Sequence, residues 1–405
     1  MIKANVIAAR ENPGFSPEIP AGAGVVPVSE ASRFVIFPGF CDVHVHFREP
    51  GFSYKETIRT GSMAAARGGY TEVLAMPNLS PVPDSPEHME TELELIRRDA
   101  VISVRPYAAL TVGEKGREPA DIEGLAPYAA AFSDDGKGVQ DEGMMREVMA
   151  RCRACGKVLA AHCEDESLLH GGYIHAGEYA KARGHRGICA ESEWRPIERD
   201  LRLAAETGVK YHVCHISTKE SLRLIREAKK SGVDVTCETA PHYLLLDESD
   251  LREEGRFKMN PPLRGADDRE ALLEGLADGT IDMIATDHAP HSAEEKARGL
   301  EKSPFGIVGI ETAFPLLYTY LVKKGAITTE RLLELMVSAP RARFGLTQSS
   351  ADWSLWELET QYAIDPSRFL SMGRATPFSG WNVFGSCLMT VAGGRIAYSC
   401  IEVLK

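Results

Sequence analysis

Residues 39–51 read GFCDVHVHFREPG, and this stretch opens the part of the chain that decides the fold. It holds the first of eight short β-rich apolar runs, which alternate with longer amphipathic segments. The runs are Phe40–His44, Thr71–Ala75, Ser103–Ala109, Ala129–Phe132, Val158–His162, Lys210–His215, Asp234–Glu238 and Asp282–Thr286. Alternating strands and helices imply parallel pairing, so eight such units predict an α/β protein with a closed (β/α)8 TIM-like barrel.

The segments between these runs have helical periodicity. The predicted helices are Lys55–Arg67, Ser85–Arg98, Glu142–Ala154, Glu191–Glu206, Lys219–Lys230, Asp267–Ala277, Glu311–Lys323 and Thr329–Arg343. An open doubly wound sheet is the rival fold, but the Gly-rich phosphate loop that would favour it is missing after the first strand. We expect the barrel over residues 38–345. Residues 1–37 and 346–405, rich in Pro, Gly and Ser, are expected to pair as a small β subdomain.

Composition excludes several classes of function. The chain has 405 residues, and 46 Lys plus Arg against 58 Asp plus Glu give a net charge of −12, which disfavours non-specific nucleic-acid binding. No apolar run approaches the about 20 residues that cross a bilayer, and the start lacks the pattern of a signal peptide. The nine cysteines have no framework spacing, which indicates reduced thiols. A soluble, cytoplasmic protein without membrane contact is predicted.

Metal-binding side chains gather where the predicted strands end. His44 and His46 are two residues apart in a strand, so they face the same side and can reach one ion together. His162 and His215 end the fifth and sixth runs. Asp287 follows the eighth run, and Asp135 lies three residues beyond the fourth. Barrel active sites form at the C-terminal ends of the strands, and four imidazoles with two carboxylates suit zinc or a similar divalent ion. A carboxylate can also bridge two ions.

Other polar residues near these positions are harder to assign. His212 precedes His215 by three residues, so we expect it to pack outward against the helices as a structural residue. His242, just past the seventh run, is left open. Asp42 must be paired if it is buried, and whether it orients a ligand is undecided. Surface or supporting roles are expected for the histidines in helical or loop segments, His88, His170, His175 and His185.

The segments that carry these residues closely resemble those of dihydroorotases, in the amidohydrolase superfamily. They are GFCDVHVHFREPG (39–51), MPN (76–78), FSDDG (132–136), HCED (162–165), CHISTKES (214–221), ETAPHYLLL (238–246), KMNPPLR (258–264), ATDHAPH (285–291) and FGIVGIETAFPL (305–316). Their order and spacing match across nearly the whole barrel. The combination of H-x-H-F-R-E-P-G with M-P-N and T-D-H-A-P-H is more specific than a superfamily signature.

The resemblance implies a binuclear centre with two Zn²⁺ per subunit. It gives one ion to His44, His46 and Asp287 and the other to His162 and His215. Many members of the superfamily bridge their metals with a carboxylated lysine, which FSDDG lacks, and the chain resembles the type with an aspartate in that role. We assign the bridge to Asp135, because it precedes the HCED histidine by the interval of that type, with Asp134 as the rival.

The resemblance also implies an activity, the reversible hydrolysis of (S)-dihydroorotate to N-carbamoyl-L-aspartate in de novo pyrimidine (UMP) biosynthesis. In the hypothesis, a metal-activated hydroxide attacks the ring amide, with Asp287 as general base and then general acid. Arg48, two residues beyond His46, is expected to bind the substrate carboxylate as a bidentate fork. The resemblance completes the substrate site with Asn78 and His291 at the carboxylate and with Asn260, Val308 and Gly309 at the amide edge.

Two rival functions remain. One is another cyclic amidase, a dihydropyrimidinase or allantoinase. The other is a non-catalytic dihydroorotase-like partner of aspartate carbamoyltransferase, which should have lost metal ligands that are all present here. A homodimer is expected by resemblance, with the carbamoyltransferase as a candidate partner. Residues 292–303, rich in Glu, Lys and Ala, are expected to form either a mobile lid or a solvated helix, and the short stretch before the barrel suggests a trimmed N-terminal β sandwich.

Overall fold

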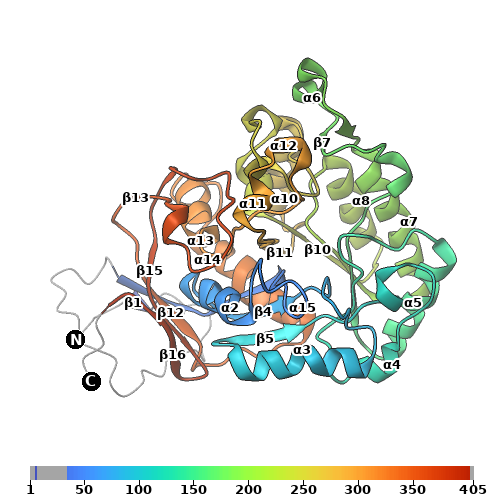
Figure 1. The fold of residues 1–405 in the computed structure, drawn as a ribbon, viewed down its shortest axis with the longest axis horizontal. Coiled ribbons are helices and arrows are strands. Elements are labelled where there is room, and N and C mark those ends of the chain that lie inside the picture. The colour runs from blue at the N-terminus through green and yellow to red at the C-terminus, as the bar shows by residue number, and fades with distance from the viewer. Residues whose placement is uncertain (1–4, 7–33, 402–405) are drawn as a thin grey trace.

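The computed structural model describes residues 5–6 and 34–401 (Figure 1). Parallel strands form the barrel in two hydrogen-bonded groups, β3-β4-β5 and β6-β9-β10-β11. Their bounds are β3 (Phe40–Val45), β4 (Tyr70–Ala75), β5 (Ser103–Pro106), β6 (Val158–Ala161), β9 (Lys210–Val213), β10 (Val235–Thr239) and β11 (Met283–Ile284). Each overlaps a run that the sequence predicts as a strand, and β3, β4 and β10 extend one residue beyond their runs.

The two groups of strands are joined by short bridges. Phe132, in the fourth predicted run, pairs in parallel with Ala108 on one side and with Leu159 on the other. On the opposite side, Val45 pairs in parallel with His288, so the segment after β11 returns to β3. Eight strand positions therefore close into a ring, and the predicted TIM-like barrel is confirmed.

The barrel interior is packed with side chains from alternate positions of the strands. Tyr107 is fully buried there and donates its hydroxyl to the carbonyl of Val43 at 3.1 Å. The interior cluster contains Cys41, Val43, Leu74, Met76, Tyr107, Ala131, Val158, Ala160, Cys214, Met283, Ala285 and Phe344. The intervening strand residues belong to a separate cluster with the surrounding helices. This alternation follows the period of two in a β-strand.

The helices begin where the sequence provides capping residues. Thr57, Ser85, Asp141 and Thr218 each accept a hydrogen bond from a first-turn amide of the helix that follows. The longer helices are α2 (Ile58–Arg67), α3 (Pro86–Asp99), α5 (Glu142–Ala154), α7 (Glu191–Thr207), α8 (Lys219–Lys230) and α10 (Ala266–Asp278). The short ones are α4 (Ile122–Leu125), α6 (Glu178–Arg183), α9 (Pro241–Leu245), α11 (Ala293–Lys296) and α12 (Gly299–Lys302).

The last two predicted helices contain π-helical turns. Helix α13 (Ala313–Leu317) continues as η5 (Tyr318–Val322), whereas α14 (Thr329–Leu333) continues through η6 (Glu334–Ser338) into α15 (Ala339–Phe344). Hydrophobic periodicity does not reveal such turns, because each inserts a local i→i+5 pattern into an otherwise helical segment.

Strands from both ends of the chain form one sheet beside the barrel (Figure 1). Its order is β1 (Asn5–Val6), β2 (Phe34–Pro38), β12 (Trp353–Glu357), β15 (Ser386–Ala392) and β16 (Arg395–Ser399). The rings of Trp356 and Phe314 lie 4.3 Å apart between centroids, and Phe40 stacks on Phe314 at 5.2 Å, which fastens the sheet to the barrel. The domain boundaries at 37/38 and 345/346 stay predictions. The expected N-terminal trimming falls on residues 7–33, outside the described residues.

Two smaller strand pairs lie outside these sheets, β7 (Ile174–His175) with β8 (Gly187–Ile188), and β13 (Tyr362–Ala363) with β14 (Asn382–Val383). All nine cysteines fall within the described residues and none forms a disulfide, in agreement with the predicted reduced thiols. Within residues 34–401, no helix combines the length and apolar character that a membrane crossing requires.

Candidate metal centre and substrate cleft

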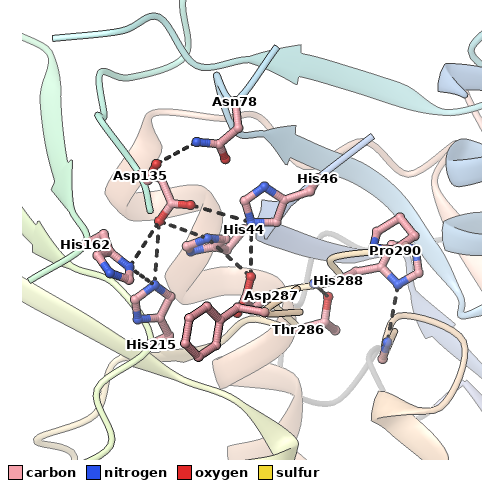
Figure 2. Close-up of polar contacts among 12 residues, drawn as sticks. His44, His46, Asn78, Asp135, His162, His215, Thr286, Asp287, His288 and Pro290 are labelled. Atoms are coloured by element: carbon pink, nitrogen blue, oxygen red, sulfur yellow. Dashed lines mark hydrogen bonds and ion pairs between the residues drawn. The ribbon is translucent and has the colours of Figure 1, made fainter. Parts of the chain in front are cut away.

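The six predicted ligands converge at the C-terminal ends of the barrel strands. Figure 2 shows Asp135 with His162 and His215 on one side and His44 and His46 on the other. His44 lies near the end of β3, and His162 and His215 follow β6 and β9. The six side chains come from five strand ends far apart in sequence, and the barrel brings all of them together: His44, His46, Asp135, His162, His215 and Asp287.

Asp135 is the centre of this cluster. Its Oδ1 lies 3.4 Å from Nε2 of His44 and 3.5 Å from Nε2 of His215, and its Oδ2 lies 3.5 Å from Nε2 of His46. Nδ1 of His162 is 3.8 Å from the same Oδ1. One carboxylate thus faces imidazoles on both sides, as a bridging ligand must.

Asp287 completes the first half of the cluster. Its Oδ1 is 3.1 Å from Nε2 of His46 and 3.6 Å from Nε2 of His44. In the second half, Nδ1 of His162 and Nε2 of His215 are 3.1 Å apart. One ligand atom each from His44, His46 and Asp287 lie within 4.8 Å of one another, and so do those of His44, Asp135 and His215.

The spacing of these atoms fits ligands that share an ion. Ligand atoms about 2.0–2.2 Å from a tetrahedral zinc ion lie roughly 3.3–3.6 Å from one another. The separations of 3.4, 3.5, 3.5 and 3.6 Å around Asp135 and Asp287 match this edge length. They are long for hydrogen bonds, so direct pairing does not account for them.

Several buried polar atoms of the cluster lack a hydrogen-bond partner among the described residues. The two that face the centre of the cluster are Nε2 of His44 and Oδ1 of Asp135, which lie 3.4 Å apart. Buried polar groups are otherwise almost always satisfied, because desolvation without a partner costs about 1–3 kcal/mol per group. A divalent cation accepts electron pairs from such atoms, so the residues present fit a metal centre.

Charge within the cluster is strongly coupled. Burial alone would raise the pKa of the Asp135 carboxyl, but the neighbouring imidazoles, His44 first, hold it well below its usual range. Burial likewise opposes the charged form of His44, yet the carboxylates of Asp135 and Glu238 raise its pKa well above the ordinary value. The carboxylates are therefore held ionised, which is the form that binds a cation.

The structure separates Asp135 from its rival Asp134. The Asp134 carboxylate accepts hydrogen bonds from the amides of Leu110 and Thr111 at 2.8 and 3.1 Å and from the Thr111 hydroxyl. Asp134 therefore anchors the loop after β5, and only its neighbour faces the histidines.

Three residues of the site adopt left-handed backbone conformations that side chains disfavour. The φ angles are 58° at Arg48, 31° at His215 and 47° at Asp287. Such conformations cost on the order of 1–3 kcal/mol each and concentrate at functional sites. At His215 the turn interrupts the alternation of β9, so the side chain enters the site although its position in the strand would direct it outward.

The same turn explains why the prediction for His212 is wrong. His212 is fully buried and shares the parity of Cys214, which belongs to the barrel interior, whereas Tyr211 and Val213 face the helices. Its ring packs edge-on against Phe344 of the interior cluster. Only unbroken alternation up to His215 would put His212 on the outer face, and the left-handed turn at His215 breaks it.

Sequence reasoning missed Glu238, at the end of β10. Its Oε1 lies 2.7 Å from Nδ1 of His44, and its Oε2 lies 3.2 Å from Nε2 of His212. His212 in turn contacts the hydroxyl of Thr236 through Nδ1 at 2.8 Å. A buried carboxylate on the far nitrogen of a ligand fixes the imidazole's tautomer and orientation. The available signal was a glutamate at a strand end, inside the ETAPHYLLL segment.

The structure shows the surroundings of Asp42 and His242, whose roles the sequence leaves open. Asp42 accepts hydrogen bonds from the Thr286 hydroxyl at 2.6 Å and from the His44 amide at 3.1 Å, so it links the first barrel strand to the last. His242 is buried at the start of α9, and its Nε2 has no hydrogen-bond partner in residues 34–401. None of the other four histidines lines the cleft, in agreement with their predicted supporting roles: His88, His170, His175 and His185.

A cleft of about 250 Å³ opens over the cluster. Arg48, Asn78 and Asn260 line it, together with Asp135 and Asp287. The Arg48 guanidinium makes only long contacts of 3.4 Å, to the Pro290 carbonyl and to the His291 ring, and pairs with no carboxylate among the described residues. It is therefore open to an anionic group of a ligand.

Three residues predicted to contact the substrate do not line this cleft themselves. His291 lines a neighbouring cavity, and its Nε2 bonds the Phe305 carbonyl at 2.7 Å. The Val308 amide donates to the carbonyl of Ala375 and the Gly309 amide to the His288 ring, at 2.9 and 3.3 Å. Phe305, Gly306 and Ala289 line the cleft instead.

Comparison with known proteins decides the family. A curated protein named dihydroorotase from Bacillus licheniformis is 53% identical over 386 residues, which cover 93% of this chain and 90% of the relative. A dihydroorotase from Geobacillus kaustophilus is 50% identical over 94% of this chain and 91% of the relative. The chain belongs to the dihydroorotase family. The predicted family is thereby confirmed, and the "Dihydro-orotase-like" family profile also matches residues 33–221.

Solved structures share the architecture of this dihydroorotase family member. The L-hydantoinase (dihydropyrimidinase) from Arthrobacter aurescens superposes with a TM-score of 0.81 at 27% identity, over 92% of this chain and 87% of that one. The dihydropyrimidinase from Brevibacillus agri superposes with a TM-score of 0.79 at 22% identity, over 94% and 90%. The likeness to the second shows the fold alone, and both agree with the barrel described above.

Proposed function

We propose that this chain catalyses the reversible hydrolysis of (S)-dihydroorotate to N-carbamoyl-L-aspartate, a step of de novo pyrimidine biosynthesis. As a dihydroorotase it is a metal-dependent cyclic amide hydrolase. One observation carries the proposal beyond the family name. The carboxylate of Asp135 stands between two groups of imidazoles on the floor of a cleft whose rim carries the unpaired Arg48.

We propose that the cluster binds two zinc ions. His44, His46 and Asp287 would hold one ion, His162 and His215 the other, with Asp135 between them. The unpartnered Nε2 of His44 and Oδ1 of Asp135 support this assignment, and so does the ligand-like spacing of the ring nitrogens around Asp135. When bound, such ions acidify a shared water and polarise a carbonyl group.

Asp287 is the proposed proton carrier. It lines the cleft, and its carboxylate is held ionised against the effect of burial, chiefly by His46 and His44. In the hydrolytic direction it takes a proton from the water whose oxygen bonds to the ring carbonyl carbon. As the C–N bond breaks, Asp287 gives that proton to the ring nitrogen, and ring closure is the reverse.

Arg48 is the proposed anchor of the substrate carboxylate. Its guanidinium presents paired N–H donors in a fixed plane, which suits a carboxylate that the reaction leaves unchanged. Asn78 and Asn260, which also line the cleft, are proposed to contact the substrate. His291 can join them only if its ring gives up the bond to Phe305. The Val308 and Gly309 amides would need their present acceptors replaced in the same way.

The activity is tested by following the loss of dihydroorotate ultraviolet absorbance with purified, zinc-loaded protein. Dihydrouracil, the same ring without the carboxylate, is the discriminating second substrate. We expect turnover of dihydroorotate with little or none of dihydrouracil. The opposite preference would assign the chain to the dihydropyrimidinases. No turnover of either substrate would refute the proposed activity, and failure to retain zinc as well would favour the non-catalytic partner of aspartate carbamoyltransferase.

Two variants separate the proposed roles in the same assay. Asp287→Asn should abolish turnover while the protein stays folded, and a rate near wild type would refute the proton-carrier role. Arg48→Lys keeps the charge but loses the fork, so we expect KM for dihydroorotate to rise about tenfold or more. An unchanged KM would remove Arg48 from the carboxylate site. The homodimer and the carbamoyltransferase partner stay predictions from the resemblance, and the cytoplasmic location stays a prediction from the composition.

A further inference from the structure

One wall of the cleft is held from behind by side chains that do not themselves line it. Residues 304–306, called here the cleft wall, contribute Phe305 and Gly306 to the lining. Each of their three consecutive carbonyls accepts a hydrogen bond from a side chain. Nζ of Lys296 donates to the carbonyls of Pro304 and Gly306 at 2.9 and 2.7 Å, and Nε2 of His291 bonds that of Phe305 at 2.7 Å.

Lys296 also reaches a second segment of the lining. Its Nζ donates to the carbonyl of Lys258 at 3.2 Å, and the same carbonyl accepts the amide of Gly306 at 3.1 Å. Asn260, two residues further on, lines the cleft and donates from Nδ2 to Glu164 at 2.9 Å. A single ammonium therefore ties together two segments that both face the proposed substrate.

The setting of this lysine is unusual for a cation. Lys296 is 7% exposed, and no carboxylate oxygen forms an ion pair with its Nζ within residues 34–401. An ammonium has three N–H donors, and all three are used by backbone carbonyls. Burial, together with the nearby charge of Lys258, lowers its pKa to about 7. Burying a cation here without a counter-charge lowers the stability of the folded protein, so we expect Lys296 to have a specific role.

Anchoring of helix α11 alone does not account for these contacts. The helix is four residues long and already begins with a capping box at Ser292, whose hydroxyl accepts the Glu295 amide at 3.2 Å. The lysine at its end reaches only the carbonyls of Lys258, Pro304 and Gly306. Residues 292–303 are thus two short helices, α11 and α12, fixed onto the cleft wall from outside.

We propose that Lys296 is a positioning residue for substrate binding: its ammonium fixes the cleft wall and the Asn260 segment in the geometry that receives the ring. The inference rests on the function proposed above. Lys296 touches neither the metal cluster nor the cleft, so it acts on the fit of the substrate and leaves the proton transfer at Asp287 unaffected.

The test compares Lys296→Met, which keeps the chain length but removes every donor, with wild type and with Lys302→Met. Lys302 is an exposed residue at the end of α12, which makes it a matched control. Initial rates are measured over a range of dihydroorotate concentrations, with bound zinc determined by elemental analysis of the same samples. We expect KM to rise about tenfold, equivalent to about 1.4 kcal/mol of binding, with kcat within about threefold and zinc content unchanged.

An unchanged KM in folded Lys296→Met, or a loss confined to kcat, would overturn the proposal. If Lys296→Met does not fold, Lys296→Gln, which keeps N–H donors but no charge, is judged by the same criteria with a smaller rise in KM expected. If neither variant folds, Lys296 is a purely structural residue, and this outcome would also overturn the proposal. Inactive wild-type protein would instead refute the proposed function, so the two failures are distinguishable.

Discussion

The carboxylate of Glu238 joins two histidines that the sequence assigned to opposite faces of the barrel wall. Oε1 is 2.7 Å from Nδ1 of His44, and Oε2 is 3.2 Å from Nε2 of His212. All three side chains are buried, and the Nε2 of His44 is thereby directed at Asp135. The position of a proposed metal ligand is therefore set from inside the barrel, below the cleft.

Glu238→Gln should weaken zinc binding. The amide keeps the shape of the side chain but removes the charge that fixes the His44 ring, and changes of this kind cost about 10- to 100-fold in metal affinity. Competition with a chromophoric chelator measures the dissociation constant directly. Glu270→Gln, at an exposed position of α10, is the control. Zinc affinity equal to wild type in Glu238→Gln would show that Glu238 only fills space.

The pH dependence of stability should change when Lys296 is replaced. Burial and Lys258 lower the pKa of Lys296 from 10.5 to about 7, against the opposing charge of Glu295. Between these values the unfolded chain holds a proton at this site that the folded chain has lost, so the contribution of Lys296 to stability improves as pH rises. Below pH about 7, Lys296 is charged in the folded chain as well, and its burial then lowers the free energy of unfolding by the full amount.

The measurement is the melting midpoint of wild type and Lys296→Met at about pH 7 and about pH 9.5, below the ordinary pKa of lysine. Wild type should gain stability relative to the variant at the higher pH. The same comparison with Lys302→Met should show no such trend. A difference between wild type and Lys296→Met that does not vary with pH would mean that Lys296 does not titrate in this window.

Trp356→Ala should loosen the sheet from the barrel. Trp356 is 1% exposed and packs on Phe314 and Phe40, with ring centroids 4.3 and 5.7 Å apart. Truncating a buried tryptophan costs about 3–5 kcal/mol of unfolding free energy, and chemical denaturation measures that loss. Tyr128→Ala, at a side chain that is 52% exposed, should have little effect. Equal stability of the two variants would contradict the proposed attachment.

Much of the fold could be predicted because the barrel repeats one simple pattern. The apolar runs from Phe40 to Thr286 correspond to strand positions. Each run is short and apolar, and the segments between most of the runs show the 3.6-residue hydrophobic period of a helix, so the two kinds of element can be told apart. The fourth run was the least regular, and only Phe132 makes strand bridges there. The π-helical turns after Leu317 and Leu333 could not be predicted, because they depend on local backbone hydrogen bonding.

The site was predictable as far as strand ends determine it. The proposed ligands meet because parallel strands end at one face of the barrel. What failed was the orientation of individual groups. The left-handed φ of His215 reversed the expected face of His212. Tertiary contacts occupy the amides of Val308 and Gly309 in this structure, and their contacts with substrate stay predictions. Glu238 was missed because its partners come from other strands.

The metal requirement is the central claim, and reconstitution tests it most directly. Protein stripped with a chelator is titrated with zinc while bound metal and the loss of dihydroorotate absorbance are measured on the same samples. We predict that turnover is absent in the stripped protein and returns as zinc fills two sites per chain. Full turnover by protein that elemental analysis shows to be metal-free would contradict the account.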